Sequence, residues 1–234
     1  MNKLKELWYK IKAIPAIGIP YEQLIGKRKV EHIYKKQSKL LNASGMQCIH
    51  AVEQIMKTTD ATYFAYAGTL LGIVRDNRLI KWDSDIDYGV VIDDSFGWID
   101  LQRAMESAGC KKVREFVFEG TIREQAYQIG KLKVDFFGQT LLQDKMLMYS
   151  FERNPRVKYP ELHMNSVYEE MHPKVEKTKT IVIEGIPVTI PVNAEELLES
   201  IYTDSWRVPN PNWKSHSADS AKLLEGRYGY SVPL

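Results

Sequence analysis

Three aspartates at alternate positions constrain this chain more than any other feature. Asp83, Asp85 and Asp87 lead directly into Ile86–Ile92, an apolar run with the length and composition of a buried strand. Side chains two residues apart on a strand leave the same face, so Asp85 and Asp87 are expected to lie side by side. Adjacent carboxylates raise each other's pKa unless a cation lies between them. The pattern therefore favours a metal site over its plain alternative, a solvated acidic turn.

Oxygen ligands beside a phosphate substrate are typical of magnesium, so Mg²⁺ or Mn²⁺ is the expected ion. Asp83 is either a third member of the cluster or lies just outside it. Asp135 stands between Val134 and Phe136 in a short predicted strand. A charge buried there is costly unless it is paired or bound to metal. We therefore expect Asp135 to be a metal carboxylate from a neighbouring strand, in preference to a surface residue on an edge strand.

A small-residue turn precedes the aspartates and is a candidate phosphate site. The short apolar run 61–67 predicts a buried strand, and Gly68 and Thr69 then turn the chain. Thr69 is expected to N-cap a helix over residues 70–75, which leaves free N–H groups at the start of that helix. Such groups bind phosphate, and Gly68 would let the backbone approach it closely. A plain turn is the alternative.

The remaining pattern alternates helices and strands and predicts an α+β fold. Residues 1–60 are expected to be an N-terminal helical extension packed on the core, and residues 61–234 the catalytic domain with a C-terminal extension. The predicted helices are 27–59 with a break at Asn42–Gly45, Trp98–Gly109 and Ala194–Tyr202. The predicted strands are Lys112–Glu119, the pair Gln125–Ile129 and Leu132–Phe137, and a hairpin over Ile181–Ile190.

Two segments leave alternatives open. Residues 141–180 are less regular and are interrupted by prolines, so they are either an insertion that binds an anionic or sugar acceptor or a solvated connection. Residues 3–14 form an amphipathic, lysine-rich helical pattern. This helix is expected to pack on the protein or on a partner subunit, and the alternative is peripheral contact with an anionic membrane surface.

The net charge of +2 excludes the strongly basic surface of most polynucleotide binders, so no nucleic-acid partner is expected. Cys48 and Cys110 are far apart and lack metal-ligand spacing, which favours two reduced core thiols. No apolar run approaches the roughly 20 residues of a membrane span, and no secretory signal pattern opens the sequence. The expected location is the cytoplasm, with the inner face of the membrane as the alternative.

Two blocks of sequence resemble the signature of the LicD family, which includes bacterial phosphocholine transferases and fukutin-related glycan-modifying enzymes. The first block runs from Gly68-Thr69-Leu70-Leu71-Gly72 to Arg75, and the second is Trp82-Asp83-x-Asp85-Ile86-Asp87. Residues 132–138 and 202–209 are more loosely similar. The resemblance implies a nucleotidyltransferase-like core with a mixed or antiparallel sheet flanked by helices.

The resemblance also implies a phosphotransferase. Its donor would be a CDP-activated alcohol, such as CDP-choline or a CDP-polyol, and its acceptor a sugar hydroxyl of a cell-surface glycan or of a lipid-linked precursor. Asp85 and Asp87 would hold the metal against the pyrophosphate, and Asp135 would complete the site and orient or deprotonate the attacking hydroxyl. Thr69 would cradle a phosphate and Arg75 would neutralise the leaving oxygens. The alternatives are a nucleotidyltransferase that uses an NTP and a metal-free binding protein.

Overall fold

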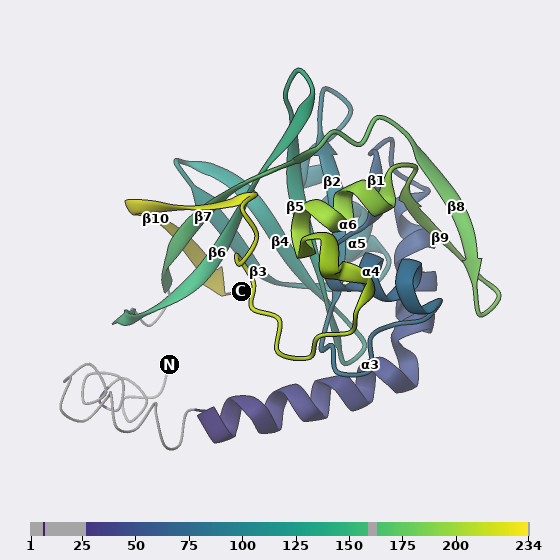
Figure 1. Cartoon of the computed structure of the whole chain (residues 1–234), viewed down its shortest axis with the longest axis horizontal. Helices are drawn as coiled ribbons and strands as arrows, with labels where there is room; N and C mark the ends of the chain where they lie inside the picture. Colours follow the sequence, from purple (N-terminus) through teal and green to yellow (C-terminus); the bar gives the residue numbers. More distant parts are fainter. Residues whose placement is uncertain (1–6, 8–26, 159–162, 234) are drawn as a thin grey trace.

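The computed structural model describes Leu7, residues 27–158 and residues 163–233, which form an α+β fold (Figure 1). A large, mostly antiparallel sheet is flanked by helices, as the sequence predicts. The helices are α3 (Lys27–Met56), α4 (Ala67–Asp76), α5 (Trp98–Ser107), α6 (Ala194–Tyr202) and the 3-10 helix η2 (Asp204–Arg207). The strands are β1 (Tyr63–Ala65), β2 (Ile86–Ile92), β3 (Lys111–Phe118), β4 (Thr121–Ile129), β5 (Leu132–Leu141), β6 (Lys145–Lys158), β7 (His163–Pro173), β8 (Thr178–Ile183), β9 (Ile186–Pro191) and β10 (Ala221–Pro233).

The large sheet closes partly on itself. Its strand order is β1-β2-β5-β4-β3-β10-β7-β6, and β6 also pairs with β5 where Thr140 faces Leu147. This additional pairing joins β5, β4, β3, β10, β7 and β6 into a ring. The separate hairpin of β8 and β9 turns at Glu184 and Gly185, both with positive φ, where the sequence predicts it. The ring leaves β1 and β2 as an extension of the sheet beside β5.

The pairing of β2 with β5 is parallel and positions the site. Asp87 lies opposite Asp135 in this register, and their neighbours Tyr88 and Phe136 are likewise paired. Paired residues on adjacent strands point to the same face of a sheet, and successive residues point to opposite faces. Asp87 and Asp135 therefore share one face, while Tyr88 and Phe136 enter the core on the other.

Helix α3 is continuous, so the predicted break at Asn42–Gly45 is wrong. Gly45 lies inside the helix, where a Cβ would overlap the Leu79 side chain, and it therefore serves close packing. Asn42 donates through Nδ2 to the backbone oxygens of Ser38 and Lys81, at 2.6 and 2.8 Å, so it joins the helix to the loop before β2. Long helices tolerate such residues when tertiary contacts compensate.

The region 141–180 is more regular than its prolines indicated. It contains β6 and β7, which pair over most of their length and belong to the large sheet. The C-terminal residues also contribute β10, a strand that the sequence analysis did not predict, between β3 and β7. These three strands build half of the ring. The pairings of β10 with β3 and β7 join segments far apart in the sequence, which local patterns do not reveal.

The core is continuous between α3 and the sheet. Leu41, Ile49 and Val52 of α3 are buried in one hydrophobic cluster with residues of β1, β2 and β5. Cys48 and Cys110 are free and buried, as predicted. The division into an N-terminal extension and a catalytic domain stays a prediction.

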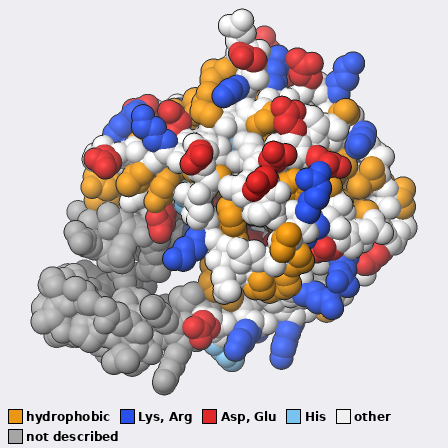
Figure 2. Space-filling model, viewed as in Figure 1, with side chains coloured by type: hydrophobic (Ala, Val, Ile, Leu, Met, Phe, Trp, Pro, Cys, Tyr) orange, Lys and Arg blue, Asp and Glu red, His pale blue; other side chains and the backbone are white. Residues whose placement is uncertain are grey.

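Charge is mixed on the face shown in Figure 2, where Lys and Arg side chains are interspersed with Asp and Glu. The described residues on this face form no continuous basic surface, and the exclusion of nucleic acid stays a prediction. Among the described residues, no helix has the length and apolar character needed to cross a membrane. Apart from Leu7, the predicted helix 3–14 lies outside the described residues.

Candidate metal centre and substrate cavity

Helix α4 begins earlier than predicted and is held directly against β2. Its first residue is Ala67 and its N-cap is Tyr66, whose N–H donates to the Asp87 carbonyl oxygen at 2.9 Å. The prediction that Thr69 caps the helix is wrong. The Thr69 hydroxyl is buried and accepts a hydrogen bond from the Asp87 N–H at 2.9 Å. Thr69 therefore joins the start of α4 to the aspartate strand, and its expected role in cradling a phosphate stays a prediction.

Gly68 lies directly against Asp83. A Cβ at position 68 would overlap the Asp83 Oδ2 atom, so glycine lets this carboxylate lie beside the first turn of α4, and a larger residue would displace it. The other Asp83 oxygen, Oδ1, accepts a hydrogen bond from the Ser84 N–H at 2.9 Å. Burial, followed by repulsion from Asp85, raises the pKa of Asp83 to about 7.

Asp85, Asp87 and Asp135 converge as the sequence predicts. Each offers a carboxylate oxygen, and these atoms all lie within 4.8 Å of one another. Asp135 is 3% exposed, and its Oδ1 atom makes no hydrogen bond with any described residue. A buried, unpartnered carboxylate oxygen beside two further carboxylates is the donor set that a hard divalent cation requires. The residues present therefore fit a Mg²⁺ or Mn²⁺ ion.

The electrostatics of the cluster favour an added cation. Burial and the neighbouring carboxylates raise the pKa of Asp87 well above its ordinary value, and burial raises that of Asp135. Lys133 gives partial compensation, because its Nζ lies 2.6 Å from Asp135 Oδ2 and 3.3 Å from Asp85 Oδ2. Burial alone lowers the pKa of Lys133, but Asp135 and Asp85 outweigh it, so the amine stays charged.

A cavity of about 490 Å³ opens over the cluster. Its lining includes Lys133 and Glu124, a buried acid of β4 whose pKa is raised by burial and by Asp135. Neither residue was predicted from the sequence to belong to the site. Lys133 and Asp135 are two apart on β5 and share a face, which was a usable signal. Glu124 carried no such signal in the sequence, because only the pairing of β4 with β5 brings it to the site.

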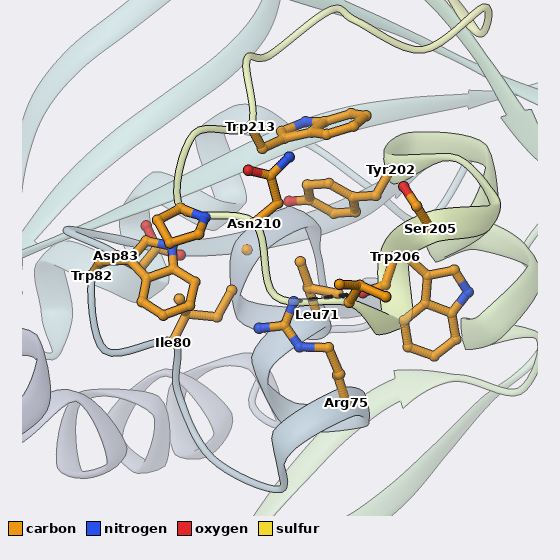
Figure 3. A pocket seen from close by; sticks show the side chains of 13 residues that line it. Leu71, Arg75, Ile80, Trp82, Asp83, Tyr202, Ser205, Trp206, Asn210 and Trp213 are labelled. Carbon is orange, nitrogen blue, oxygen red and sulfur yellow. Dashed lines mark hydrogen bonds between the residues drawn. The ribbon is translucent and has the colours of Figure 1, made fainter.

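Arg75 faces a second, smaller cavity of about 170 Å³ that shares Gly68, Asp83, Tyr202 and Trp213 with the first. Its guanidinium binds Asp76 through Nε at 3.0 Å and through NH2 at 2.8 Å, and its NH1 lies 3.5 Å from the Trp206 carbonyl oxygen. Figure 3 shows Arg75 pointing into this cavity from α4, with the Tyr202 and Trp213 rings across from it. Arg75 does not line the cavity over the aspartates, and we call its own cavity the aromatic cavity.

One family model matches this chain. The model describes the LicD/FKTN/FKRP nucleotidyltransferase domain and matches residues 60–193, more than half of the sequence. The chain belongs to this family. A comparison with curated proteins finds no match. The matched segment runs from just before β1 to just after β9 and contains the three converging aspartates. Membership suggests a transferase with a phosphotransferase or glycan-modifying role.

Proposed function

We propose that this LicD-family chain is a metal-dependent phosphotransferase. It would move a phospho-alcohol, such as phosphocholine or a polyol phosphate, from a CDP-activated donor to a sugar hydroxyl of a cell-surface glycan or its precursor, and CMP would leave. One observation carries the proposal: Asp85, Asp87 and Asp135 offer oxygens within 4.8 Å of one another at a cavity of about 490 Å³. Phosphoryl transfer depends mainly on positioning and charge neutralisation, which such a site provides.

The residues of the cavity divide these tasks. Asp85, Asp87 and Asp135 would hold Mg²⁺ or Mn²⁺, which when bound neutralises charge on the donor phosphates. Lys133 keeps a positive charge within 2.6 Å of Asp135 and is available to a phosphate oxygen. The backbone N–H groups in the first turn of α4, at Gly68 and Thr69, would bind a second phosphate. This role is assigned to the backbone, because the Thr69 side chain is buried and is not among the residues that line the cavity.

The aromatic cavity would receive the part of the donor that lies beyond the pyrophosphate. It shares Gly68 and Asp83 with the larger cavity, so one molecule can occupy both. Its volume of about 170 Å³ suits a single ring or a small head group. In this arrangement Arg75 contacts the donor away from the metal, where it contributes to donor binding.

A nucleotidyltransferase that moves NMP from an NTP to a small hydroxylated molecule is the alternative. The nucleotidyltransferase description of the matching family domain favours it, and the same three carboxylates would serve it. The products separate the two reactions, because the alternative releases pyrophosphate from NTP and the proposed reaction releases CMP.

The test is CMP release from CDP-choline and from CDP-ribitol with Mg²⁺ or Mn²⁺ and a glycan acceptor. Asp87→Asn is expected to lower the rate at least about 100-fold, because an amide replaces a metal-binding carboxylate. Asp94→Asn is the matched control, since Asp94 is an exposed aspartate just after the same strand and should leave the rate unchanged. Equal CMP release by wild type and Asp87→Asn would contradict the proposal, and pyrophosphate release from an NTP would favour the alternative.

A further inference from the structure

The wall of the larger cavity that β6 and β7 form carries a polar cluster of its own. Ser150, Glu170 and His216 all line the cavity and are bonded to one another. The Ser150 hydroxyl donates to Glu170 Oε1, and His216 Nε2 lies 2.8 Å from the same hydroxyl oxygen. On the far side of the carboxylate, His172 Nε2 lies 3.3 Å from Glu170 Oε2. The proposed reaction, as described so far, uses none of these groups.

Glu170 is an anion at neutral pH. Burial alone raises the pKa of Glu170, but hydrogen bonds from His172 and Ser150 outweigh burial and hold it below its ordinary value. Burial lowers the pKa of His216, against the opposing effect of Glu170, so this imidazole is neutral. The cluster therefore presents one negative charge to the cavity, together with a neutral ring and a hydroxyl.

The positive side chains of the cavity lie with the aspartates. The described residues that line the cavity include one lysine, Lys133, and one arginine, Arg114. Both charges lower the pKa of the Asp135 and Glu124 carboxyls and so serve that side of the cavity. The strand neighbours of Glu170 are apolar, because Met148 of β6 and Ala221 of β10 lie opposite it in register. The β6–β7 wall thus combines a negative charge with apolar surface and has no lysine or arginine partner within the described lining.

His216 is held firmly at this wall. Its backbone has a φ of 64°, a left-handed conformation that costs energy for a residue other than glycine. Its ring stacks on Tyr168 with centroids 3.8 Å apart and planes 9° apart. The loop after η2 therefore places a neutral imidazole beside Glu170 in a fixed orientation, which suits recognition of a defined set of hydroxyl groups.

We propose that Glu170, Ser150 and His216 form the acceptor subsite of the cavity, which binds a neutral, hydroxyl-bearing sugar ring and excludes negatively charged sugars. The inference rests on the proposed function for the identity of the acceptor. The carboxylate accepts hydrogen bonds from sugar hydroxyl groups, the neutral imidazole has one donor and one acceptor nitrogen, and Met148 offers apolar contact to a ring face. Glu170 repels an acidic acceptor, so it selects by charge as well as by hydrogen bonding. The sequence left open whether residues 141–180 bind an anionic or a sugar acceptor, and the charge of Glu170 favours a neutral sugar.

The test measures sugar binding without any donor. Saturation-transfer NMR would compare neutral methyl glycosides of glucose, galactose and N-acetylgalactosamine with methyl glucuronide and methyl galacturonide. The wild-type protein is expected to bind a neutral glycoside and to bind the uronides at least about tenfold more weakly, which corresponds to about 1.4 kcal/mol. Glu170→Gln should bring the two classes within about twofold of each other, because the repulsion is removed.

Glu152→Gln is the matched control. Glu152 lies on β6 and accepts a hydrogen bond from Tyr168, the ring that stacks on His216, yet it is exposed and does not line the cavity. This variant should keep the wild-type discrimination. Ser150→Ala provides a second variant, which is expected to bind neutral glycosides more weakly than wild type does. An unchanged thermal shift with Mn²⁺ would show that each variant is folded.

The outcomes separate this inference from the proposed function. Uronides that bind wild type as well as neutral glycosides do, no glycoside binding at all, or unaltered discrimination in Glu170→Gln would each overturn the acceptor subsite. Absence of CMP release from CDP-alcohols would overturn the phosphotransferase and leave the measured sugar discrimination as it stands.

Discussion

The two faces of β2 lie against carboxylates in opposite circumstances. Tyr88 points to the core, where its hydroxyl donates to Glu53 Oε1 at 3.2 Å. The same glutamate accepts hydrogen bonds from the Tyr63 hydroxyl at 2.9 Å, the Thr189 N–H at 2.9 Å and the Thr189 hydroxyl at 2.8 Å. Glu53 is fully buried and fully satisfied, and it joins α3 to β1, β2 and β9.

On the other face, Asp87 lies with Asp85 and Asp135 above an open cavity. Asp135 has an oxygen without a partner among the described residues, and the pKa of Asp87 is raised by burial and by its acidic neighbours. The comparison teaches that burial of a carboxylate does not by itself mark function. Glu53 stabilises the fold because its hydrogen-bond donors belong to the core, whereas Asp135 keeps an oxygen without a donor among the described residues and would be completed by the proposed metal ion.

The largest expected effect on stability comes from Glu53→Ala. Removing this acceptor leaves buried donors on Tyr63, Tyr88 and Thr189 without partners, so the free energy of unfolding should fall by roughly 3 kcal/mol. Urea unfolding followed by circular dichroism would measure it. Glu53→Gln, which keeps one acceptor oxygen, should lose less. A fall in the free energy of unfolding below about 0.5 kcal/mol for Glu53→Ala would mean that these hydrogen bonds do not stabilise the fold.

Asp87→Asn should change stability in the opposite direction. A carboxyl with a raised folded pKa favours folding when protonated and opposes it as pH rises from the unfolded pKa toward the folded one. Without metal at neutral pH, the amide should therefore raise the free energy of unfolding, because burial and the neighbouring carboxylates raise the pKa of the Asp87 carboxyl that it replaces. The gain should shrink toward acid pH. A variant less stable than wild type in EDTA would remove the contrast between the two faces.

Lys133→Met tests the positive charge that the site already holds. In metal-free protein it should lower the free energy of unfolding by about 1 kcal/mol or less, because Lys133 is 43% exposed and its ion pairs are screened. Mn²⁺ should restore that loss, since the ion takes over compensation of Asp85 and Asp135. The measurement is thermal unfolding with and without Mn²⁺, and a destabilisation that Mn²⁺ fails to reduce would argue that Lys133 is purely structural.

The smallest effect concerns Cys48, on the Glu53 side of β2. Burial raises the pKa of this thiol from 9.0 to about 12. Because the thiol ionises at lower pH in the unfolded chain than in the folded one, its contribution to stability is complete below pH 9 and is lost as pH rises. The fall in the free energy of unfolding should be less than about 1 kcal/mol near pH 9.5. Cys48→Ala should show a shallower alkaline decline than wild type in pH-dependent urea unfolding. The same slope in both proteins would show that the thiol ionises freely in the folded state.

Local chemistry in the sequence determined part of the site. The alternation of Asp85 and Asp87 fixed a shared face, and Asp135 within an apolar strand indicated a buried charge that needs a partner. Gly68 lies against the Asp83 carboxylate, and its predicted contact with phosphate stays a prediction. The prediction that Thr69 caps α4 is wrong, because its hydroxyl accepts a hydrogen bond from the Asp87 N–H, 18 residues away in the chain.

The sequence by itself determined the α+β class, the aspartate strand and the family signature, because periodicity and short motifs are local properties. The tertiary structure alone decided which distant groups meet. The parallel pairing of β2 with β5 set Asp87 opposite Asp135, and the ring closed by β6, β7 and β10 brought Glu170 and His216 to the same cavity. Strand pairing depends on packing between segments far apart in the chain, so no local pattern encodes it.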